Sequence, residues 1–129
     1  IYADETQLSI VIGELLRNAI DASPQSGRIH MQTSSDPLKD ERWVRLVVSD
    51  EGQGLDDEAR EHLFDPFYSG RQAGRGLGFG LSKAWRIVTN HGGRIQVDST
   101  VESAFSIVVH WPADQATATQ AQAKAPRPL

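Results

Sequence analysis

The stretch 74-GRGLGFGLSKAWRIV-88 joins a glycine-rich segment to a helix-like pattern. Every second residue from Gly74 to Gly80 lacks a Cβ atom, so the backbone there can come close to a ligand. The residues that follow have helical spacing, with one apolar side formed by Leu81, Ala84, Trp85 and Val88. Free N–H groups and the dipole at a helix N-terminus favour a phosphate. A flexible turn before a helix explains the glycines about equally well when they are taken alone.

A second stretch, 43-WVRLVVS-49, is rich in β-branched and apolar residues and predicts a strand that stops at Asp50. An Asp followed by nearby glycines is common in ordinary turns at strand ends. The same pattern suits a nucleobase, because an ionised Asp50 only accepts hydrogen bonds and therefore matches the exocyclic amine of adenine. Gly52 and Gly54 would let a flat ring lie against the backbone. Guanine has a carbonyl at the corresponding position, so adenine is the expected base.

An amphipathic helix is predicted near the start of the chain, with Asp4 as its N-cap. Its wide apolar stripe contains Leu8, Val11, Ile12, Leu15, Leu16, Ala19 and Ile20. Glu14, Asn18 and Asp21 share one face, with Arg17 beside them. A solvated surface is the ordinary explanation for Asp21 and Arg17. Asn18 borders the apolar stripe, where an unpaired amide is costly, so it needs a partner such as a metal ion or its water shell.

Four stretches occur in a fixed order: 14-ELLRNA-19, 50-DEGQG-54, 63-LFDPFY-68 and 74-GRGLGFGL-81. They resemble the N, G1, F and G2 boxes of the histidine-kinase catalytic and ATP-binding domain. That domain belongs to a superfamily shared with DNA gyrase, the heat-shock chaperone and mismatch-repair ATPases. The resemblance extends from about Asp4 to Pro112. The Phe64-x-x-Phe67 pattern and the short stretch before Gly74 are more similar to the kinase branch than to gyrase-like members, which have longer lids.

The resemblance implies that the chain binds ATP and Mg²⁺, with Asn18 and Glu14 as metal ligands and Asp50 as the acceptor for the adenine amine. Glu14 and Arg71 are the implied catalytic residues. Glu14 would act as a general base toward water or polarise an incoming imidazole, and Arg71 would neutralise charge on the γ-phosphate. The other implied nucleotide-binding residues shape the base pocket, contact phosphates or anchor the ATP lid: Gly52, Gly54, Phe64, Phe67, Gly74, Gly76, Leu77, Gly78, Gly80 and Leu81.

Two positions depart from the family pattern. Leu77 stands where the family more often has Thr, and Phe79 stands where it usually has Leu. The missing hydroxyl removes one hydrogen bond to a phosphate or to the lid, worth about 1 kcal/mol in typical cases. This change is expected to tune nucleotide binding and not to abolish it.

The order of the predicted elements gives the fold class. Half-buried strands are predicted over 27–34, 94–99 and 104–111, with a short helix over 56–62 and a hairpin turn near Glu102. This order predicts an α/β two-layer sandwich, in which a mixed, mostly antiparallel sheet is covered on one face by about three helices. The resemblance identifies this architecture as the Bergerat-type ATP-binding fold.

Two regions are expected within the chain. Residues 1–112 are expected to form the ATP-binding catalytic domain. Residues 113–129 are mostly Ala, Gln, Thr and Pro and are expected to be a disordered tail or linker. Family members usually have a further strand before the first helix, so the chain is expected to be an N-terminally truncated piece of a longer protein.

Composition fits one small domain of 129 residues. The net charge of -4 argues against a general nucleic-acid binder. The sequence contains no transmembrane run or signal peptide, so this piece is expected to make no membrane contact. The absence of cysteine excludes disulfides and thiolate metal sites. ATP chemistry favours the cytoplasm, and a membrane anchor elsewhere in the full-length protein is compatible with that location.

The expected function is that of the catalytic domain of a two-component sensor histidine kinase, which transfers the γ-phosphoryl group of ATP to a histidine. The four histidines, His30, His62, His91 and His110, lack the setting of a phosphoacceptor on a dimeric helical hairpin. The phosphoacceptor is therefore expected on a separate dimerisation domain of the same full-length protein, and a response regulator is the expected downstream partner.

Two alternatives remain open at the level of sequence. One is an ATP hydrolase of the gyrase or chaperone type, which Glu14 as a water-activating base supports and the short lid opposes. The other is a degenerate module that binds nucleotide only to dock a partner. Asn18, Asp50 and the glycines oppose that second alternative, whereas Leu77 supports it.

Overall fold

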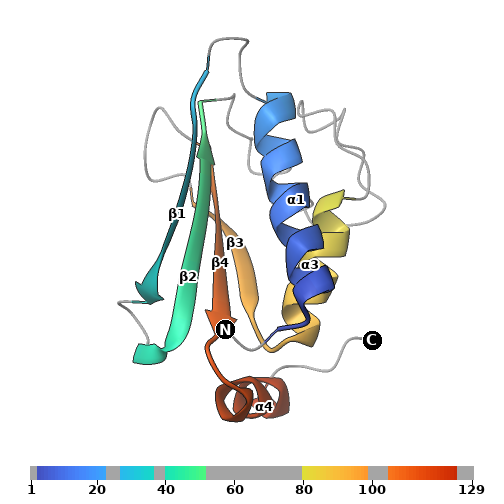
Figure 1. The fold of residues 1–129 in the computed structure, drawn as a ribbon, viewed down its shortest axis with the longest axis vertical. Coiled ribbons are helices and arrows are strands. Elements are labelled where there is room, and N and C mark those ends of the chain that lie inside the picture. The colour runs from blue at the N-terminus through green and yellow to red at the C-terminus, as the bar shows by residue number, and fades with distance from the viewer. Residues whose placement is uncertain (1–2, 23–26, 37–39, 52–79, 99–104, 125–129) are drawn as a thin grey trace.

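A computed structural model describes residues 3–22, 27–36, 40–51, 80–98 and 105–124. The elements in chain order are α1 (Glu5–Ala22), β1 (Ile29–Asp36), β2 (Asp40–Asp50), α3 (Gly80–Asn90), β3 (Arg94–Asp98), β4 (Phe105–Pro112) and α4 (Gln115–Lys124). Figure 1 shows α1 and α3 side by side along one face of the sheet, to its right in this view, with α4 below the end of β4. The predicted helix at 56–62 and the predicted turn near Glu102 lie outside the described residues.

The first helix begins as predicted. The backbone N–H of Gln7 donates a hydrogen bond to Asp4 Oδ1 at 2.9 Å, so Asp4 caps the helix. The buried face contains Val11, Leu15, Asn18 and Ala19. Ile20, predicted to belong to the apolar stripe, is instead 63% exposed because it lies on the side of α1 opposite the centre of that face.

The sheet has the order β1-β2-β4-β3. All three strand pairs among the described residues are antiparallel, so the mixed character predicted for the sheet does not occur in this part of the chain. The predicted pairing of the last two strands is confirmed by the register of β3 and β4, in which Val97 is opposite Ile107. The central strand β4 is buried along its whole length, whereas the edge strand β1 is exposed from His30 to Ser35. Met31 of β1 is 53% exposed.

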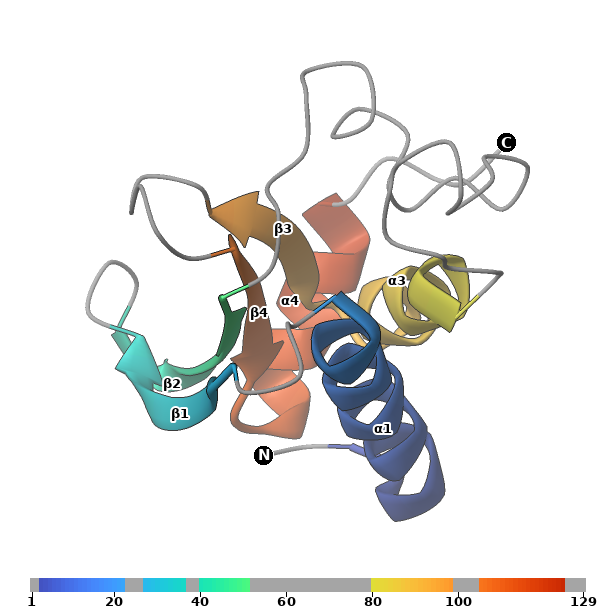
Figure 2. The same cartoon turned by 90° about the horizontal axis from the view of Figure 1, so that it is seen from above.

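Two layers enclose the core, which confirms the predicted α/β sandwich (Figure 2). The helical layer contributes Val11, Leu15, Leu81, Ala84 and Val88, and the sheet contributes alternate residues of β2 and β4: Leu46, Val48, Phe105, Ile107, Val109 and Trp111. Trp85 is an exception to the predicted stripe of α3. It is 41% exposed, because it lies on the flank of the helix while Leu81, Ala84 and Val88 lie at its centre.

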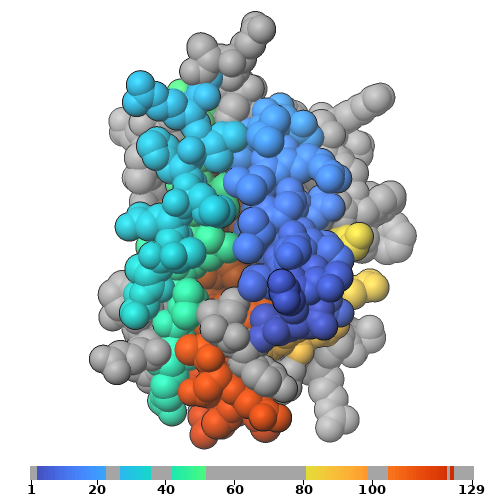
Figure 3. Space-filling view, in the orientation of Figure 1, coloured from blue at the N-terminus to red at the C-terminus, as the bar shows by residue number. Residues whose placement is uncertain are grey.

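On the face shown in Figure 3, β1 lies beside α1, and side chains of β2 are visible between them. The edge strand β1 therefore lies beyond the part of the sheet that the helices cover. No helix within the described residues is long and apolar enough to cross a membrane.

Residues 115–124 differ from the predicted disordered tail, because they form helix α4. Asp114 caps this helix by accepting a hydrogen bond from the N–H of Thr117 at 2.8 Å. Thr117 and Ala118 are buried. The turn after α3 makes room for them: Gly92 has φ of 80°, and a Cβ atom there would lie 2.7 Å from the carbonyl oxygen of Ala118. The helix is thus held by close backbone packing and not by a large apolar face.

Candidate functional site

Three elements meet where the predicted site residues lie. The C-terminal half of α1, the C-terminal end of β2 and the N-terminus of α3 all reach the upper half of the molecule in Figure 1. Each contributes one predicted residue that is only 2% exposed: Asn18 from α1, Asp50 from β2 and Leu81 from α3. Segments far apart in the sequence therefore bring an amide, a carboxylate and a helix N-terminus to the same end of the fold.

Asn18 lies on the buried face of α1 and not at its edge. It is 2% exposed, nearly as buried as its neighbours Leu15 and Ala19. An amide is costly in such a place unless it is hydrogen-bonded, and Asn18 does interact with another group in the structure. Asparagine on an otherwise apolar face is therefore a polar group held in a defined position, with a carbonyl oxygen suited to a hard cation.

Glu14 lies one helical turn before Asn18 on the same side of α1. Its side chain is 17% exposed, and its Oε1 atom is 3.6 Å from Nη1 of Arg17, whose side chain is 70% exposed. The sequence places Arg17 beside this face without anticipating the ion pair, although the i, i+3 spacing of opposite charges is the signal that predicts such a pair. Exposed pairs of this kind are weak, so Arg17 leaves the Glu14 carboxylate accessible to another cation.

The donor set fits magnesium better than a metal with many protein ligands. Within the described residues, no group of three or more His, Cys, Asp or Glu side chains is positioned to hold a metal ion. Glu14 and Asn18 offer oxygen atoms from one helix face. Mg²⁺ characteristically binds to one or two protein oxygens and fills its other positions with water and substrate phosphates. These two residues would therefore hold the ion together with a bound nucleotide.

Asp50 is the last residue of β2 and lies between two strands. It is opposite Ile29 of β1 and opposite Phe105 of β4. Because side chains alternate along a strand, Asp50 shares the helix-facing side of the sheet with Leu46 and Val48. A carboxylate buried at the rim of an apolar core is a directional acceptor, and it discriminates between ligand groups that donate and groups that accept hydrogen bonds.

The glycine-rich segment leads into a helix, as predicted. Helix α3 begins at Gly80, and its first turn contains no acidic residue. The positive end of the helix dipole is thus not neutralised by its own side chains, which favours an anion at this end. Leu81 is buried in the core and holds the first turn against the sheet.

The remaining predicted site residues lie outside the described part of the chain: Gly52, Gly54, Phe64, Phe67, Arg71, Gly74, Gly76, Leu77 and Gly78. Their roles remain predictions. The described residues supply the metal side, the base acceptor and the helix N-terminus of the predicted site.

The chain matches a known protein family along most of its length. Residues 3–115 match the family described as histidine kinase-, DNA gyrase B-, and HSP90-like ATPase. The chain belongs to this family. Membership in this ATPase family implies ATP binding.

Similar full-length proteins of this ATPase family are sensor kinases. Sensor protein FixL of Bradyrhizobium diazoefficiens is 31% identical over 113 residues, covering 88% of this chain and 22% of FixL. Sporulation kinase A of Bacillus subtilis is 31% identical over 112 residues, covering 87% of this chain and 18% of that protein. The chain therefore spans about a fifth of the length of these relatives.

Solved structures of the family share the fold. The catalytic domain of histidine kinase ThkA superposes with a TM-score of 0.73 at 28% identity, covering 86% of this chain and 70% of that domain. The mycobacterial sensor histidine kinase MprB gives a TM-score of 0.73 at 27% identity, covering 87% of this chain and 76% of the MprB chain. The architecture of this chain is therefore that of a histidine kinase catalytic domain.

Proposed function

We propose that this chain is the ATP-binding catalytic domain of a sensor histidine kinase and transfers the γ-phosphoryl group of ATP to a histidine on a separate dimerisation domain. The observation that carries the proposal is the convergence of buried Asn18, buried Asp50 and the unneutralised N-terminus of α3 in a chain with the kinase catalytic fold. Residues 1–112 are the proposed catalytic domain.

The residues of this chain would act mainly by alignment and by charge stabilisation, which dominate phosphoryl-transfer catalysis. Asp50 would accept a hydrogen bond from the adenine amine and so orient the nucleotide. The N-terminus of α3, with Gly74, Gly76, Gly78, Gly80 and the amide of Leu81, would donate hydrogen bonds to phosphate oxygens. Asn18, with Glu14, would hold Mg²⁺, which supplies charge neutralisation between the phosphates.

Two further roles complete the proposal. Glu14 would polarise the incoming imidazole, and Arg71 would offset charge on the γ-phosphate. Gly52 and Gly54 would shape the base pocket, Leu77 would contact the phosphate side, and Phe64 and Phe67 would anchor the lid. The partners are the dimerisation domain of the same full-length protein and a response regulator, in the cytoplasm. ThkA has been solved in complex with a response regulator, TrrA, which is a precedent for the second partner.

The proposal is tested by mixing the purified chain with a separately purified histidine-containing dimerisation domain and ATP labelled on its γ-phosphate. Transfer of label in an acid-labile, alkali-stable form is expected. Asp50→Asn should prevent transfer, whereas Asp98→Asn, an acidic residue of β3, should not. Tight ATP binding with no transfer to any such domain would overturn the kinase proposal and support a nucleotide-binding docking module.

A second candidate function is ATP hydrolysis. The partly buried Glu14 beside Asn18 favours it, because a carboxylate in this position can act as a base toward water. If the chain is a hydrolase, the isolated chain should release ADP steadily, and Glu14→Gln should abolish this release. Release that survives Glu14→Gln, or that is absent in the wild type, excludes the hydrolase.

A further inference from the structure

A basic row crosses the sheet face that α1 and α3 leave uncovered. Arg45 of β2 and Arg94 of β3 are both opposite His110 of β4, one from each side. Directly paired residues project to the same face of a sheet, so the three side chains form one row. Leu46 and Val109 are the next residues along their strands and enter the core, which places the row on the opposite face. Neighbouring strands are about 5 Å apart, so the two arginine Cα atoms are separated by ~10 Å.

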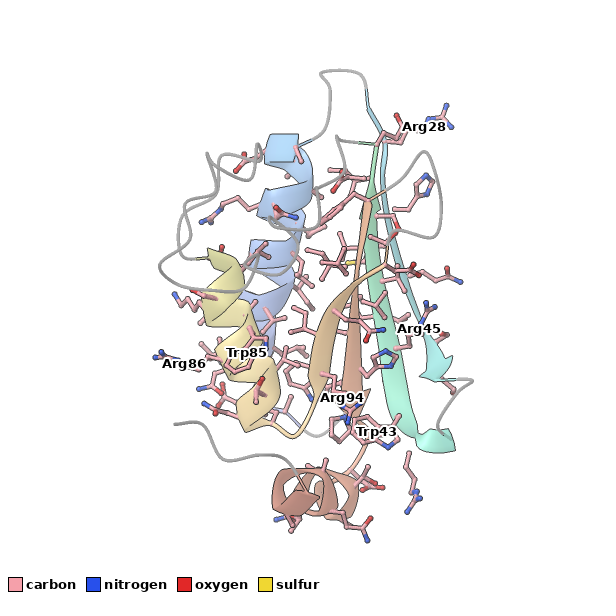
Figure 4. The ribbon with its side chains drawn as sticks, turned by 180° about the vertical axis from the view of Figure 1, so that it is seen from behind. Arg28, Trp43, Arg45, Trp85, Arg86 and Arg94 are labelled. Atoms are coloured by element: carbon pink, nitrogen blue, oxygen red, sulfur yellow. The ribbon has the colours of Figure 1, made fainter. Side chains whose placement is uncertain are left out.

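The two arginines of this row carry charge without an ionic partner among the described residues. Arg94 is exposed, Arg45 is half-buried, and neither side chain forms an ion pair or hydrogen bond in the part of the chain that the structure describes. His110 is buried between them. Figure 4 shows Arg94 of β3 and Trp43 of β2 at the same end of the sheet, with Arg45 farther along β2. The chain as a whole has a net charge of -4, so two unpaired arginines in one row depart from its general acidic character.

We propose that Arg45 and Arg94, which flank buried His110 in this row, form with Trp43 at the border of the row a docking surface for an acidic segment of a partner protein. The guanidinium group is planar and always charged, and its fork of donors matches a carboxylate in a bidentate manner. Trp43 shares the outward face of β2 with Arg45, two residues away, and offers a partly exposed aromatic surface beside the two charges. Complementary charge of this kind gives specificity and a high association rate.

The same face limits the length of the bound anion. Asp98 of β3 is opposite Ser106, which is also opposite Ser49 of β2. This row is four residues along each strand from the basic row, a distance of about 13 Å. A long polyanion such as a nucleic acid would pass from the arginines toward the Asp98 carboxylate. A short segment with a few Asp or Glu residues fits the basic row alone, so a protein segment is the occupant that the charge pattern favours.

Docking here goes beyond nucleotide binding and does not depend on it. Arg45 precedes Asp50 by five residues along β2, which corresponds to about 17 Å. Arg45 also faces away from the helical layer, whereas Asp50 faces toward it. Both sites can therefore be occupied at the same time.

The test uses a fluorescein-labelled octapeptide of alternating Glu and Ser, followed by fluorescence anisotropy at low ionic strength. The wild-type chain is expected to bind it, and a peptide with Gln in place of Glu is expected not to bind. Arg45→Glu and Arg94→Glu should each weaken binding by about tenfold, since both lose an attraction and add a repulsion. Arg86→Glu makes the same change in net charge at an exposed position of α3, in the helical layer (Figure 4), and should change binding less than twofold.

Several results would overturn the docking proposal: absence of binding, equal binding of the Glu and Gln peptides, or an equal loss in Arg86→Glu. Tighter binding of an eight-nucleotide oligothymidylate, or of phosphatidylglycerol vesicles, at the same two arginines would replace the protein segment with another anion. Arg94→Glu changes an exposed side chain and should keep the wild-type circular dichroism, so it remains informative if Arg45→Glu fails to fold. The ATP affinity of Arg94→Glu should equal that of the wild type. A loss of peptide binding in this variant therefore tests the docking surface separately from the proposed kinase activity.

Discussion

His91 links the two helices of the helical layer by accepting a hydrogen bond, through Nε2, from the backbone N–H of Asp4 at 3.4 Å. Its Nδ1 atom is 2.8 Å from the carbonyl oxygen of Ile87. A carbonyl oxygen only accepts, so Nδ1 carries the proton and Nε2 is free to accept. The ring also packs against Trp111, with centroids 5.1 Å apart. One side chain thus contacts the N-terminus of α1, the C-terminus of α3 and the C-terminal end of β4.

Replacing His91 should therefore destabilise the fold. His91→Ala removes the bond to the α1 terminus, the bond to Ile87 and the ring contact, and should lower the free energy of unfolding by about 1–3 kcal/mol. Urea denaturation followed by circular dichroism measures the change. His30→Ala, at an exposed position of β1, is the control and should stay within about 0.5 kcal/mol of wild type. Equal stability of both variants would contradict a linking role for His91.

Gly92→Ala tests the packing of α4 against the turn after α3. The new Cβ would lie 2.7 Å from the carbonyl oxygen of Ala118, and the residue would keep a φ of 80° that L side chains rarely adopt. A loss of roughly 2 kcal/mol or more is expected from strain and displacement of α4. Thermal unfolding measures it. A variant that unfolds like the wild type would mean that α4 does not stay packed on this turn.

Gly13→Ala is the matched change in the opposite direction. Gly13 lies within α1, and a Cβ atom there would meet nothing within 4 Å. Removing backbone freedom from the unfolded chain should raise the free energy of unfolding by about 0.5–1 kcal/mol. The expected sign is a higher melting temperature. A decrease would show that the exposed side of α1 is covered at this position.

Asp50→Asn tests recognition of the base. An amide can still accept a hydrogen bond, but it loses the charge, and its NH₂ group can turn toward the adenine amine. Loss of a charged hydrogen bond should weaken binding of a non-hydrolysable ATP analogue by about ten- to hundredfold. Isothermal titration calorimetry measures it, with Asp98→Asn as the control. Unchanged affinity would remove Asp50 from the nucleotide site.

Asn18→Ala tests the proposed metal position. Nucleotide affinity of the wild type is expected to increase when Mg²⁺ is added, and this increase should be lost in Asn18→Ala because an oxygen ligand is missing. Titration of the same ATP analogue with Mg²⁺ and with EDTA gives the comparison. Because Asn18 is buried, its replacement also perturbs the core, so the ratio of the two affinities is the readout. A ratio equal to that of wild type would place the ion elsewhere.

Sequence patterns predicted the features of this fold that depend on residues close together in the chain. Asp4 is an N-cap because its side chain reaches a backbone N–H three residues ahead, and α3 begins where the glycine run ends. Asn18 was recognisable because a polar residue beside apolar neighbours needs a partner. Asp50 was recognisable because an acceptor-only carboxylate ends an apolar strand just before two glycines. Both lie at the predicted elements and are buried.

Tertiary packing decided the rest. Trp85 satisfies the apolar period of α3 yet is exposed, because the width of the covered stripe depends on what packs against the helix. Helix α4 has no apolar period, and its place depends on the space that Gly92 leaves beside Ala118, 26 positions later in the chain. Periodicity contains no information on such a contact between distant segments.

The bond between Ser49 Oγ and Ser106 Oγ, 2.7 Å long, joins two strands that are 57 positions apart. Strand β2, which contains Ser49, ends at Asp50, shortly before residues 52–79, and these include most of the predicted nucleotide-contacting glycines and both predicted lid phenylalanines. Both serines lie outside that stretch. Its sequence can therefore change, in evolution or by engineering, without removing this link between β2 and β4.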